Sequence, residues 1–166
     1  VIEPNDDDLF RRLSEMYQEA LFIDYQALTA YQERLISILR SSTVRISDPA
    51  GTDLTFRLSN AHFHRGNGEA SKEFIAAHSR PGSARDREVE LPAGAIRTID
   101  VTDAQGTLVC TGETFGGRPV GALTYRFEDN RIVEVESQYH NDYVQAMWEL
   151  ATGDKDRIGE VNLGVN

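Results

Sequence analysis

The chain has 166 residues, 40% of them hydrophobic and 27% charged, with a formal net charge of -10. This length suits one domain of ordinary size with its own hydrophobic core. The acidity argues against a nucleic-acid partner, because phosphate backbones are bound by clustered basic residues, and the longest basic run is Arg11-Arg12. The single cysteine, Cys110, excludes an internal disulfide and indicates a reducing compartment. No apolar stretch approaches the ~20 residues that span a bilayer, so we expect a cytoplasmic protein without a membrane partner.

Both ends of the sequence have the pattern of a truncation. The chain opens with Val1 rather than methionine, and it stops within the strand-like residues 161–166. Domains usually end in exposed polar segments rather than inside an apolar pattern. We therefore expect a central fragment of a longer protein.

The first forty residues have a helical period. Apolar residues recur at three- and four-residue spacings from Leu9 to Leu21 and again from Leu28 to Leu39. The acidic residues 6–8 can cap the first helix, and a break near Asp24 lets that carboxylate cap the second. We expect a helical segment over residues 1–42.

From Thr43 onward the apolar period is two, which predicts strands. Turn residues at 48–53 join the first two strands in a hairpin. Residues 65–90 are polar and rich in Gly, Ser and Pro, so we expect a long loop there. Three short turns, at 103–106, 116–119 and 128–131, link the strands that follow, which favours antiparallel pairing.

A third helix is expected over 140–151, and the last segment, 158–165, is interpreted as a strand. The expected apolar face of this helix consists of Tyr143, Ala146, Met147 and Leu150. The sequence therefore predicts an α+β fold with N-terminal helices, a mostly antiparallel mixed sheet, and one C-terminal helix before a last strand. Residues 43–166 would form the β-rich domain.

Several residues are candidates for metal binding. His62 and His64 are two apart, so in one strand both imidazoles would point to the same side, although we favour a solvated strand edge. His140 and Asp142 have a similar spacing, and there we expect Asp142 to interact with the positive end of the helix dipole. Cys110 lies in an apolar strand pattern and is expected to be a structural thiol.

Glu160 is an acid inside the otherwise apolar residues 158–164. Gly159 and Gly164 would let a ligand or another backbone approach its strand. A carboxylate in such a strand is costly to bury unless a cation pairs with it, and a metal ion would supply that cation. The alternative, an edge strand with Glu160 in water, has equal weight.

Three stretches, in order and roughly in spacing, resemble one family: 44–56 (VRISDPAGTDLTF), 91–94 (LPAG) and 158–164 (IGEVNLG). The stretches 103–109 and 127–135 also match that family's central sheet. The chain resembles, from about Asp24 to its last residue, the thermophilic metalloaminopeptidases of the aminopeptidase T and aminopeptidase S type, peptidase family M29.

The resemblance implies a dimeric, metal-dependent hydrolase that removes N-terminal residues from peptides with divalent ions such as zinc or cobalt. Residue by residue, only Glu160 matches a metal ligand of the family. The other expected glutamate follows the LPAG stretch, where this sequence has Ala95, which cannot bind a metal. The remaining ligands would lie beyond Asn166. The resemblance thus implies an incomplete metal site and a chain that is inactive alone.

Two alternatives stay open. Ala95 and the missing ligands also suit a non-catalytic binding or dimerisation module on the same scaffold. Loss of one ligand would also suit a mononuclear iron oxygenase-like enzyme, because relatives of the same fold use a single iron to open hydroxylated pyridine rings. Glu90 or Asp100 could replace the lost ligand, and their spacing favours neither.

Overall fold

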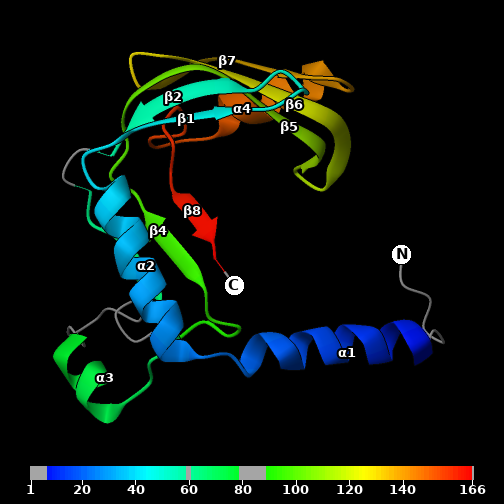
Figure 1. The fold of residues 1–166 in the computed structure, drawn as a ribbon. Coiled ribbons are helices and arrows are strands. Elements are labelled where there is room, and N and C mark those ends of the chain that lie inside the picture. The colour runs from blue at the N-terminus through cyan, green and yellow to red at the C-terminus, as the bar shows by residue number, and fades with distance from the viewer. Residues whose placement is uncertain (1–6, 59–60, 79–88, 166) are drawn as a thin grey trace. The chain divides into compact units, whose positions relative to one another are not determined.

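The structure is a computed structural model that describes residues 7–58, 61–78 and 89–165 (Figure 1). Within these residues it contains four helices and eight strands, and the predicted α+β fold is confirmed. The helices are α1 (Asp7–Leu21), α2 (Tyr25–Leu39), α3 (Lys72–His78) and α4 (Asn141–Leu150). The strands are β1 (Thr43–Ser47), β2 (Asp53–Arg57), β3 (His64–Gly66), β4 (Ala95–Thr98), β5 (Thr102–Phe115), β6 (Arg118–Glu128), β7 (Arg131–Ser137) and β8 (Val161–Gly164). No helix in these ranges is both long and apolar enough to span a membrane.

The chain forms two compact units. The first unit consists of Val1–Ser37, Phe63–Arg97 and Asn162–Asn166, and the second consists of Ile38–His62 and Thr98–Val161. The five-stranded sheet, in the order β1-β2-β5-β6-β7, belongs to the second unit. The three-stranded sheet, in the order β3-β4-β8, belongs mainly to the first.

The break between α1 and α2 is where the sequence predicts it. One carboxylate oxygen of Asp24 accepts hydrogen bonds from the backbone N–H groups of Gln26 and Ala27, both at 3.0 Å. Asp24 is therefore the N-terminal cap of α2, since it satisfies donors that have no partner inside the helix. The expected cap of α1 includes residue 6, which lies outside the described residues, but Asp7 and Asp8 do lie in its first turn.

Two hairpins of the second unit follow their local sequence. β1 and β2 pair antiparallel around a turn in which the Asp48 carboxylate accepts from the N–H groups of Ala50 and Thr52. β6 and β7 are joined by Asp129 and Asn130, which both have positive φ, at 48° and 65°. That conformation matches the twist of paired strands. Both hairpins confirm the expected turns.

The expected turn at residues 103–106 is wrong, because those residues lie inside the continuous strand β5. Thr55 pairs with Gln105 and Arg57 pairs with Thr102, so β5 has one more residue than β2 over this interval. The positive φ of Asp103, 55°, accommodates that extra residue as a bulge. Residues 103–106, which are typical of turns, therefore form part of strand β5.

Residues of α4 and of the five-stranded sheet form a hydrophobic cluster in the second unit, and Figure 1 shows α4 against that sheet. Its buried members are Val120, Leu123, Val135 and Val144. The expected apolar face of α4 is wrong in part, because Ala146 and Leu150 are exposed, whereas Val144 and Trp148 pack on the cluster. The buried face of α4 is therefore centred on Val144, which packs against sheet residues of the cluster.

Part of the loop expected over residues 65–90 has regular secondary structure. Residues 64–66 form β3, which pairs antiparallel with β4, and residues 72–78 form α3. The rest of the expected loop, 79–88, lies outside the described residues. Gln32 of α2 is fully buried there, and its Nε2 donates to the carbonyl oxygens of Gly66 at 3.2 Å and Ala95 at 3.1 Å. One side chain therefore joins α2 to β3 and β4.

Candidate functional site

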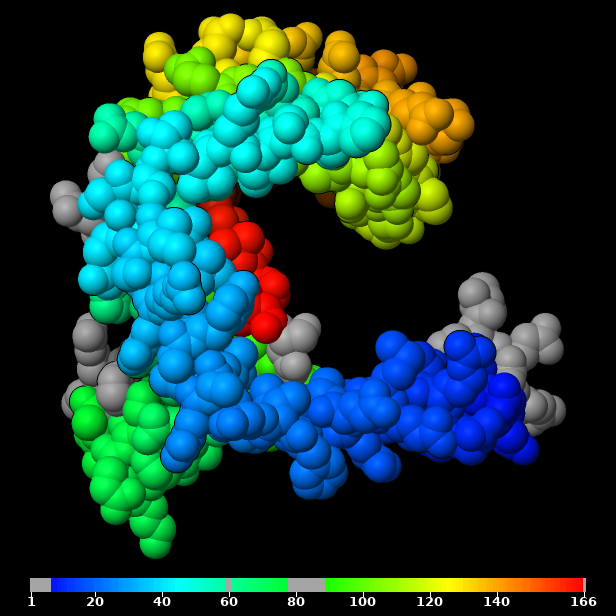
Figure 2. Space-filling model, in the orientation of Figure 1, coloured from blue at the N-terminus to red at the C-terminus, as the bar shows by residue number. Residues whose placement is uncertain are grey.

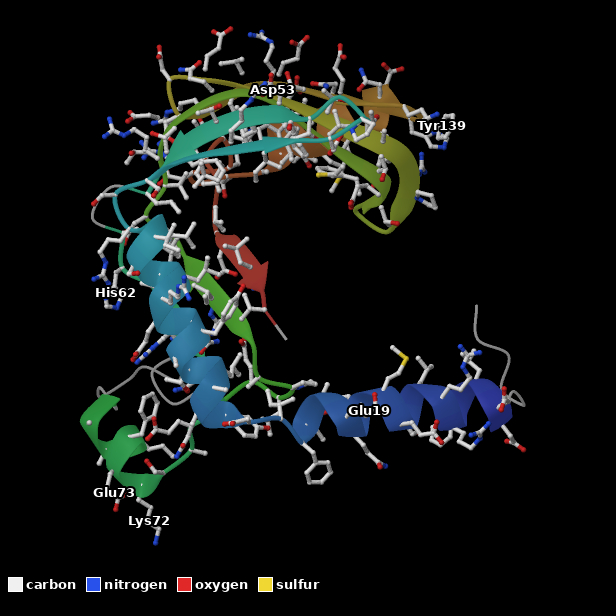
Figure 3. All side chains as sticks on the ribbon, in the orientation of Figure 1. Glu19, Asp53, His62, Lys72, Glu73 and Tyr139 are labelled. Atoms are coloured by element: carbon white, nitrogen blue, oxygen red, sulfur yellow. The ribbon has the colours of Figure 1, made fainter. Side chains whose placement is uncertain are left out.

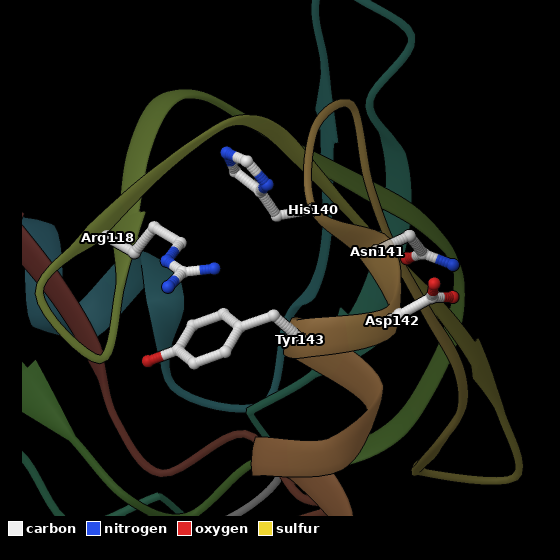
Figure 4. A pocket seen from close by; sticks show the side chains of 5 residues that line it. All are labelled: Arg118, His140, Asn141, Asp142 and Tyr143. Atoms are coloured by element: carbon white, nitrogen blue, oxygen red, sulfur yellow. The ribbon is translucent and has the colours of Figure 1, made fainter.

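A cavity of about 400 Å³ opens where α4 begins, within the second unit (Figure 4). Its lining consists of Arg118, His140, Asn141, Asp142 and Tyr143. In the view of Figure 4, the side chains of Arg118, His140 and Tyr143 lie on one side of the helix start, and those of Asn141 and Asp142 lie on the other. These three side chains lie together on one side of an open depression, where Arg118 and His140 are exposed.

The turn into α4 forms because the chain leaves β7 in a left-handed conformation. His140 has φ 59° and ψ 39°, a conformation that few residues other than glycine adopt. Its carbonyl oxygen accepts from the N–H groups of Tyr143 and Val144, whereas its imidazole makes no capping hydrogen bond. Asn141 ties the turn to β7 by accepting from the N–H of Ser137 at 3.0 Å. The His140 imidazole therefore does not cap the helix and lines the cavity instead.

Tyr143 contacts both Arg118 and Gly116 at this cavity. The guanidinium carbon of Arg118 lies 4.5 Å from the centroid of the Tyr143 ring, which is a cation–π distance. The Tyr143 hydroxyl donates to the carbonyl oxygen of Gly116 at 3.2 Å. A Cβ on Gly116 would lie 2.5 Å from that hydroxyl oxygen, so a side chain there would displace the Tyr143 hydroxyl. The pocket therefore offers the Arg118 guanidinium, which is always charged, and the His140 imidazole. These two groups suit a ligand that carries hydrogen-bond acceptors.

The histidine pair of the sequence does not form a metal site in one strand. His62 is exposed and precedes β3, whereas His64 is the first residue of β3 and is half-buried. The backbone N–H of His62 donates to the Asp100 carboxylate at 2.7 Å. Figure 3 shows the side chain of His62 on the outside of its segment. The favoured interpretation, a solvated position, agrees with the exposure of His62.

The second pair behaves as the sequence predicts. Asp142 lies in the first turn of α4, where a negative charge is favoured by the helix dipole. His140 immediately precedes the helix and is exposed. Their spacing is therefore explained by the start of a helix.

Glu160 is exposed and lies one residue before β8, so its expected place inside a strand is wrong. The strand begins only at Val161, because Gly159 and the preceding residues 151–158 are not paired in the sheet. Ala95, where the resemblance implies a glutamate, is the first residue of β4 and is half-buried. The carboxylate and the alanine belong to different units.

The two acids that could replace the ligand lost at Ala95 are both engaged. Glu90 forms an ion pair with Arg97 at 2.7 Å, and Asp100 accepts from the His62 backbone. Glu90 does approach Ala95: a Cβ built on Gly66 would lie 3.3 Å from the Glu90 carboxylate and 3.4 Å from the Ala95 Cβ. Glu90 and Ala95 thus both border Gly66, and the Glu90 carboxylate there is held by Arg97.

The described residues do not fit a complete metal centre. Residues 7–58, 61–78 and 89–165 contain no group of three or more His, Cys, Asp or Glu side chains that could hold a metal ion. A bound divalent ion needs several such ligands in one place. Glu160 can therefore act as a ligand only together with residues outside these ranges.

Cys110 is not an activated nucleophile. Burial raises the pKa of its thiol, and the negative charges of Glu113 and Asp48 raise it further. A raised pKa keeps the thiol protonated, and the thiolate is the reactive form. Cys110 packs instead against the hydrophobic cluster of the second unit, in agreement with the expected structural role.

Sequence reasoning did not find the cavity at α4. Arg118 and His140 come together because β6 pairs with β7; the sequence singles out His140 together with Asp142 but gives no reason to place Arg118 beside them. A second signal was Gly116-Gly117 before Arg118, which marks a tight turn at the end of a long hairpin.

One solved structure with the same fold is wild-type AmpT from Thermus thermophilus. The two chains have a TM-score of 0.64 and are 22% identical. The match covers 99% of this chain and 40% of the AmpT chain. No family model and no curated protein matches the sequence. At this identity the likeness shows that the fold is shared.

Proposed function

We propose that this chain is the central part of a metal-dependent, aminopeptidase-like hydrolase that removes N-terminal residues from peptides. The observation that carries the proposal is the fold match with AmpT, an aminopeptidase T, over 99% of the chain. The family to which the five sequence stretches are similar is the family of that neighbour. Motif order and backbone fold are different properties, so their agreement supports the proposal more than either alone.

In this proposal the chain contributes Glu160 as a ligand of a divalent ion such as zinc or cobalt. Its exposure suits a ligand that is completed from outside, because the described residues near the position of Ala95 supply no set of three ligands. The 166-residue chain alone would then be inactive. The helical segment 1–42, the β-rich domain 43–166, a homodimer and a cytoplasmic location belong to the same proposal.

The test uses the product of the complete reading frame that contains this chain, beside the 166-residue chain itself. Metal content by mass spectrometry and release of the N-terminal residue from dipeptides are measured for both. We expect bound divalent metal and turnover in the complete product, and loss of both on Glu160→Gln. Glu136→Gln, which removes an exposed acid on β7, is the matched control and should change neither. A complete product without any bound divalent ion would overturn the proposal.

A second candidate is a non-catalytic binding module on the same scaffold. Ala95 favours it, because an alanine where the family has a glutamate removes one ligand even from a complete protein. Ala95→Glu in the complete product distinguishes the two. A gain of metal content and of metal-dependent turnover supports the hydrolase, whereas an unchanged oligomer without turnover in either form supports the module. The iron-oxygenase hypothesis stays a prediction from the sequence.

A further inference from the structure

The cavity at the start of α4 is lined by one positively charged side chain, that of Arg118. All five lining residues, Arg118 and residues 140–143, belong to the second unit, so the cavity is formed within that unit alone. Among the residues that the structure describes, Arg118 has no acidic partner, whereas Arg126 and Arg131 of the same unit each form ion pairs. Figure 2 shows the end of the β5–β6 hairpin, in yellow-green, beside the start of α4, in orange, at the surface. The guanidinium is therefore available to a ligand.

The guanidinium of Arg118 rests on the ring of Tyr143, with 4.5 Å from its carbon to the ring centroid. The ring is itself held, because it is half-buried and its hydroxyl donates to the carbonyl oxygen of Gly116 at 3.2 Å. A guanidinium over an aromatic ring has its N–H groups at its own edge, so they can still donate to a ligand. A side chain that is positioned before binding loses less conformational entropy when the ligand arrives. Arg118 is therefore a preorganised donor.

His140 supplies a second donor to the same cavity. In Figure 4 its side chain lies on the same side of the helix start as those of Arg118 and Tyr143. It is exposed and makes no capping hydrogen bond to α4. An imidazole has one N–H donor in either neutral tautomer and two when it is protonated. The cavity therefore offers N–H donors from two side chains.

Asp142 is the one acid among the lining residues, and it does not face these donors. Figure 4 shows its side chain on the other side of the helix start. It lies in the first turn of α4, where its charge interacts favourably with the helix dipole. The chain as a whole carries a formal net charge of -10, which disfavours anions near most of its surface. An anion at this cavity would therefore be held by directed hydrogen bonds and not by a diffuse positive field.

We propose that this cavity binds a small oxyanion, namely the carboxylate or phosphate group of a small-molecule ligand. The planar guanidinium of Arg118 matches two oxygens of either group and donates two parallel hydrogen bonds to them. The imidazole of His140 donates a further hydrogen bond to the same group. A volume of about 400 Å³ is in the range of small-molecule sites. The site uses neither Glu160 nor a metal ion, so it goes beyond the proposed hydrolase function and is independent of it.

Titration of the isotopically labelled 166-residue chain with anions, followed by two-dimensional NMR, tests the proposal. Inorganic phosphate and acetate are the probes, at constant pH and ionic strength. We expect saturable shifts of the backbone amide signals of residues 118 and 140–143, with a dissociation constant on the order of millimolar. The probe that binds more tightly identifies the ligand group as phosphate or carboxylate. The proposal is overturned if neither probe produces a saturable shift.

Variants of the two donor residues test how the oxyanion is held. Arg118→Gln should raise the dissociation constant by about tenfold or more, because it removes two charge-assisted hydrogen bonds. Arg118→Lys keeps the charge without the planar fork, so we expect a rise of about fivefold. His140→Gly removes the imidazole and permits the left-handed backbone, and it should raise the dissociation constant by about threefold.

Arg157→Gln is the matched control, because it removes the same charge at another exposed arginine of the second unit. It should leave the dissociation constant within about twofold of the wild type. An Arg157→Gln effect equal to that of Arg118→Gln would mean that only the overall charge matters, and it would overturn the site. Wild-type affinity in Arg118→Lys would likewise overturn the paired hydrogen bonds. The amide signals far from the cavity verify that every variant is folded.

The complete product of the reading frame is titrated in the same way. We expect it to bind the same probe with a similar dissociation constant. A complete product that binds neither probe would show that another part of the longer protein covers the cavity, which would overturn a small-molecule ligand. These measurements require neither bound metal nor dipeptide turnover, so failure of this site and failure of the proposed function are distinguishable.

Discussion

The guanidinium of Arg118 is stacked on the ring of Tyr143, with 4.5 Å from the guanidinium carbon to the ring centroid. This contact joins the first residue of β6 to the first turn of α4. The hydroxyl of the same tyrosine donates to the Gly116 carbonyl oxygen at 3.2 Å. Tyr143 therefore fixes the wall of the cavity and holds α4 to the end of the β5–β6 hairpin.

Two substitutions of Tyr143 measure the contributions of its hydrogen bond and of its cation–π contact separately. We expect Tyr143→Phe to lower the free energy of unfolding by about 1 kcal/mol, because it removes the hydrogen bond and keeps the ring. Tyr143→Leu should lower it by about 2 kcal/mol, because the cation–π contact is lost as well. Urea unfolding measures both. Tyr139→Phe, at an exposed tyrosine next to the same turn, is the control and should stay within about 0.5 kcal/mol of the wild type. Equal losses from Tyr143→Phe and Tyr143→Leu would show that the stacked arginine adds nothing.

Gly106 is required by the close approach of β5 to β2. Its φ is 109°, and a Cβ at this position would lie 2.1 Å from the carbonyl oxygen of Asp53. Because that oxygen is backbone in a paired strand, it cannot move aside cheaply. We expect Gly106→Ala to lower the free energy of unfolding by about 3 kcal/mol, from backbone strain and steric overlap together.

The control for Gly106 is Gly117, which also has a left-handed φ, 82°, but has no atom within 4 Å of its potential Cβ. Gly117→Ala should cost only the strain of that conformation, about 1 kcal/mol. Thermal or urea unfolding of the two variants gives the comparison. If both glycines cost the same, the contact with Asp53 is not what selects glycine at residue 106.

Elements with a local signal could be predicted from the sequence. Asp24 is a cap by residue type and position, and the β1–β2 hairpin follows from alternation on both sides of turn residues. The bulge at Asp103 could not be predicted, because the same turn residues satisfy either a turn or a bulge. Pairing with β2, which is distant in sequence, decides between the two.

The candidate site was less accessible to sequence reasoning than the fold. Asp142 in the first turn of α4 follows from helix-start preferences. The left-handed His140 does not, since only a few per cent of non-glycine residues have positive φ and nothing in the sequence marks this one. For Glu160 the apolar pattern placed the start of the last strand too early, because Ile158 resembles a strand residue although pairing begins at Val161.

The ion pair of Asp156 and Arg131 makes part of the stability depend on pH. The hydrogen-bonded Arg131 guanidinium, 2.8 and 2.7 Å from the two carboxylate oxygens, lowers the pKa of Asp156, and its charge lowers it further. A pKa below the unfolded value of about 3.9 means that the pair stabilises the fold above that pH. The contribution is lost as the pH falls through the folded-state pKa.

We expect an NMR titration of the Asp156 carboxyl group to show a midpoint below that of an unfolded chain. Arg131→Gln should move this midpoint upward and should weaken the pH dependence of unfolding in the acid range. Arg157→Gln is the control, because Arg157 acts on Asp156 only through a weaker long-range attraction and should shift the midpoint less. An Asp156 midpoint that does not respond to Arg131→Gln would contradict the ion pair.

Gln32 tests how the first unit tolerates a buried polar group. Its Nε2 donates to Gly66 and Ala95, whereas its Oε1 is buried without a hydrogen-bond partner among the described residues. Gln32→Met removes two donated bonds and also an unsatisfied acceptor, and these effects oppose each other, so we expect a loss of only about 1 kcal/mol. Gln32→Glu keeps the shape but buries a carboxylate next to carbonyl oxygens, so we expect a loss of about 3 kcal/mol or more at pH 7.

The pH dependence of Gln32→Glu separates charge from packing. Burial raises the pKa of a carboxyl group above its unfolded value, so the folded state of this variant binds a proton more readily than the unfolded state does. Its free energy of unfolding, relative to the wild type at the same pH, should therefore recover as the pH falls from 7 to about 5. Gln32→Met has no titrating group, and its difference from the wild type should be constant over that range. A Gln32→Glu difference that is equally constant would mean that the carboxylate reaches water, which would contradict the complete burial of this position in the first unit.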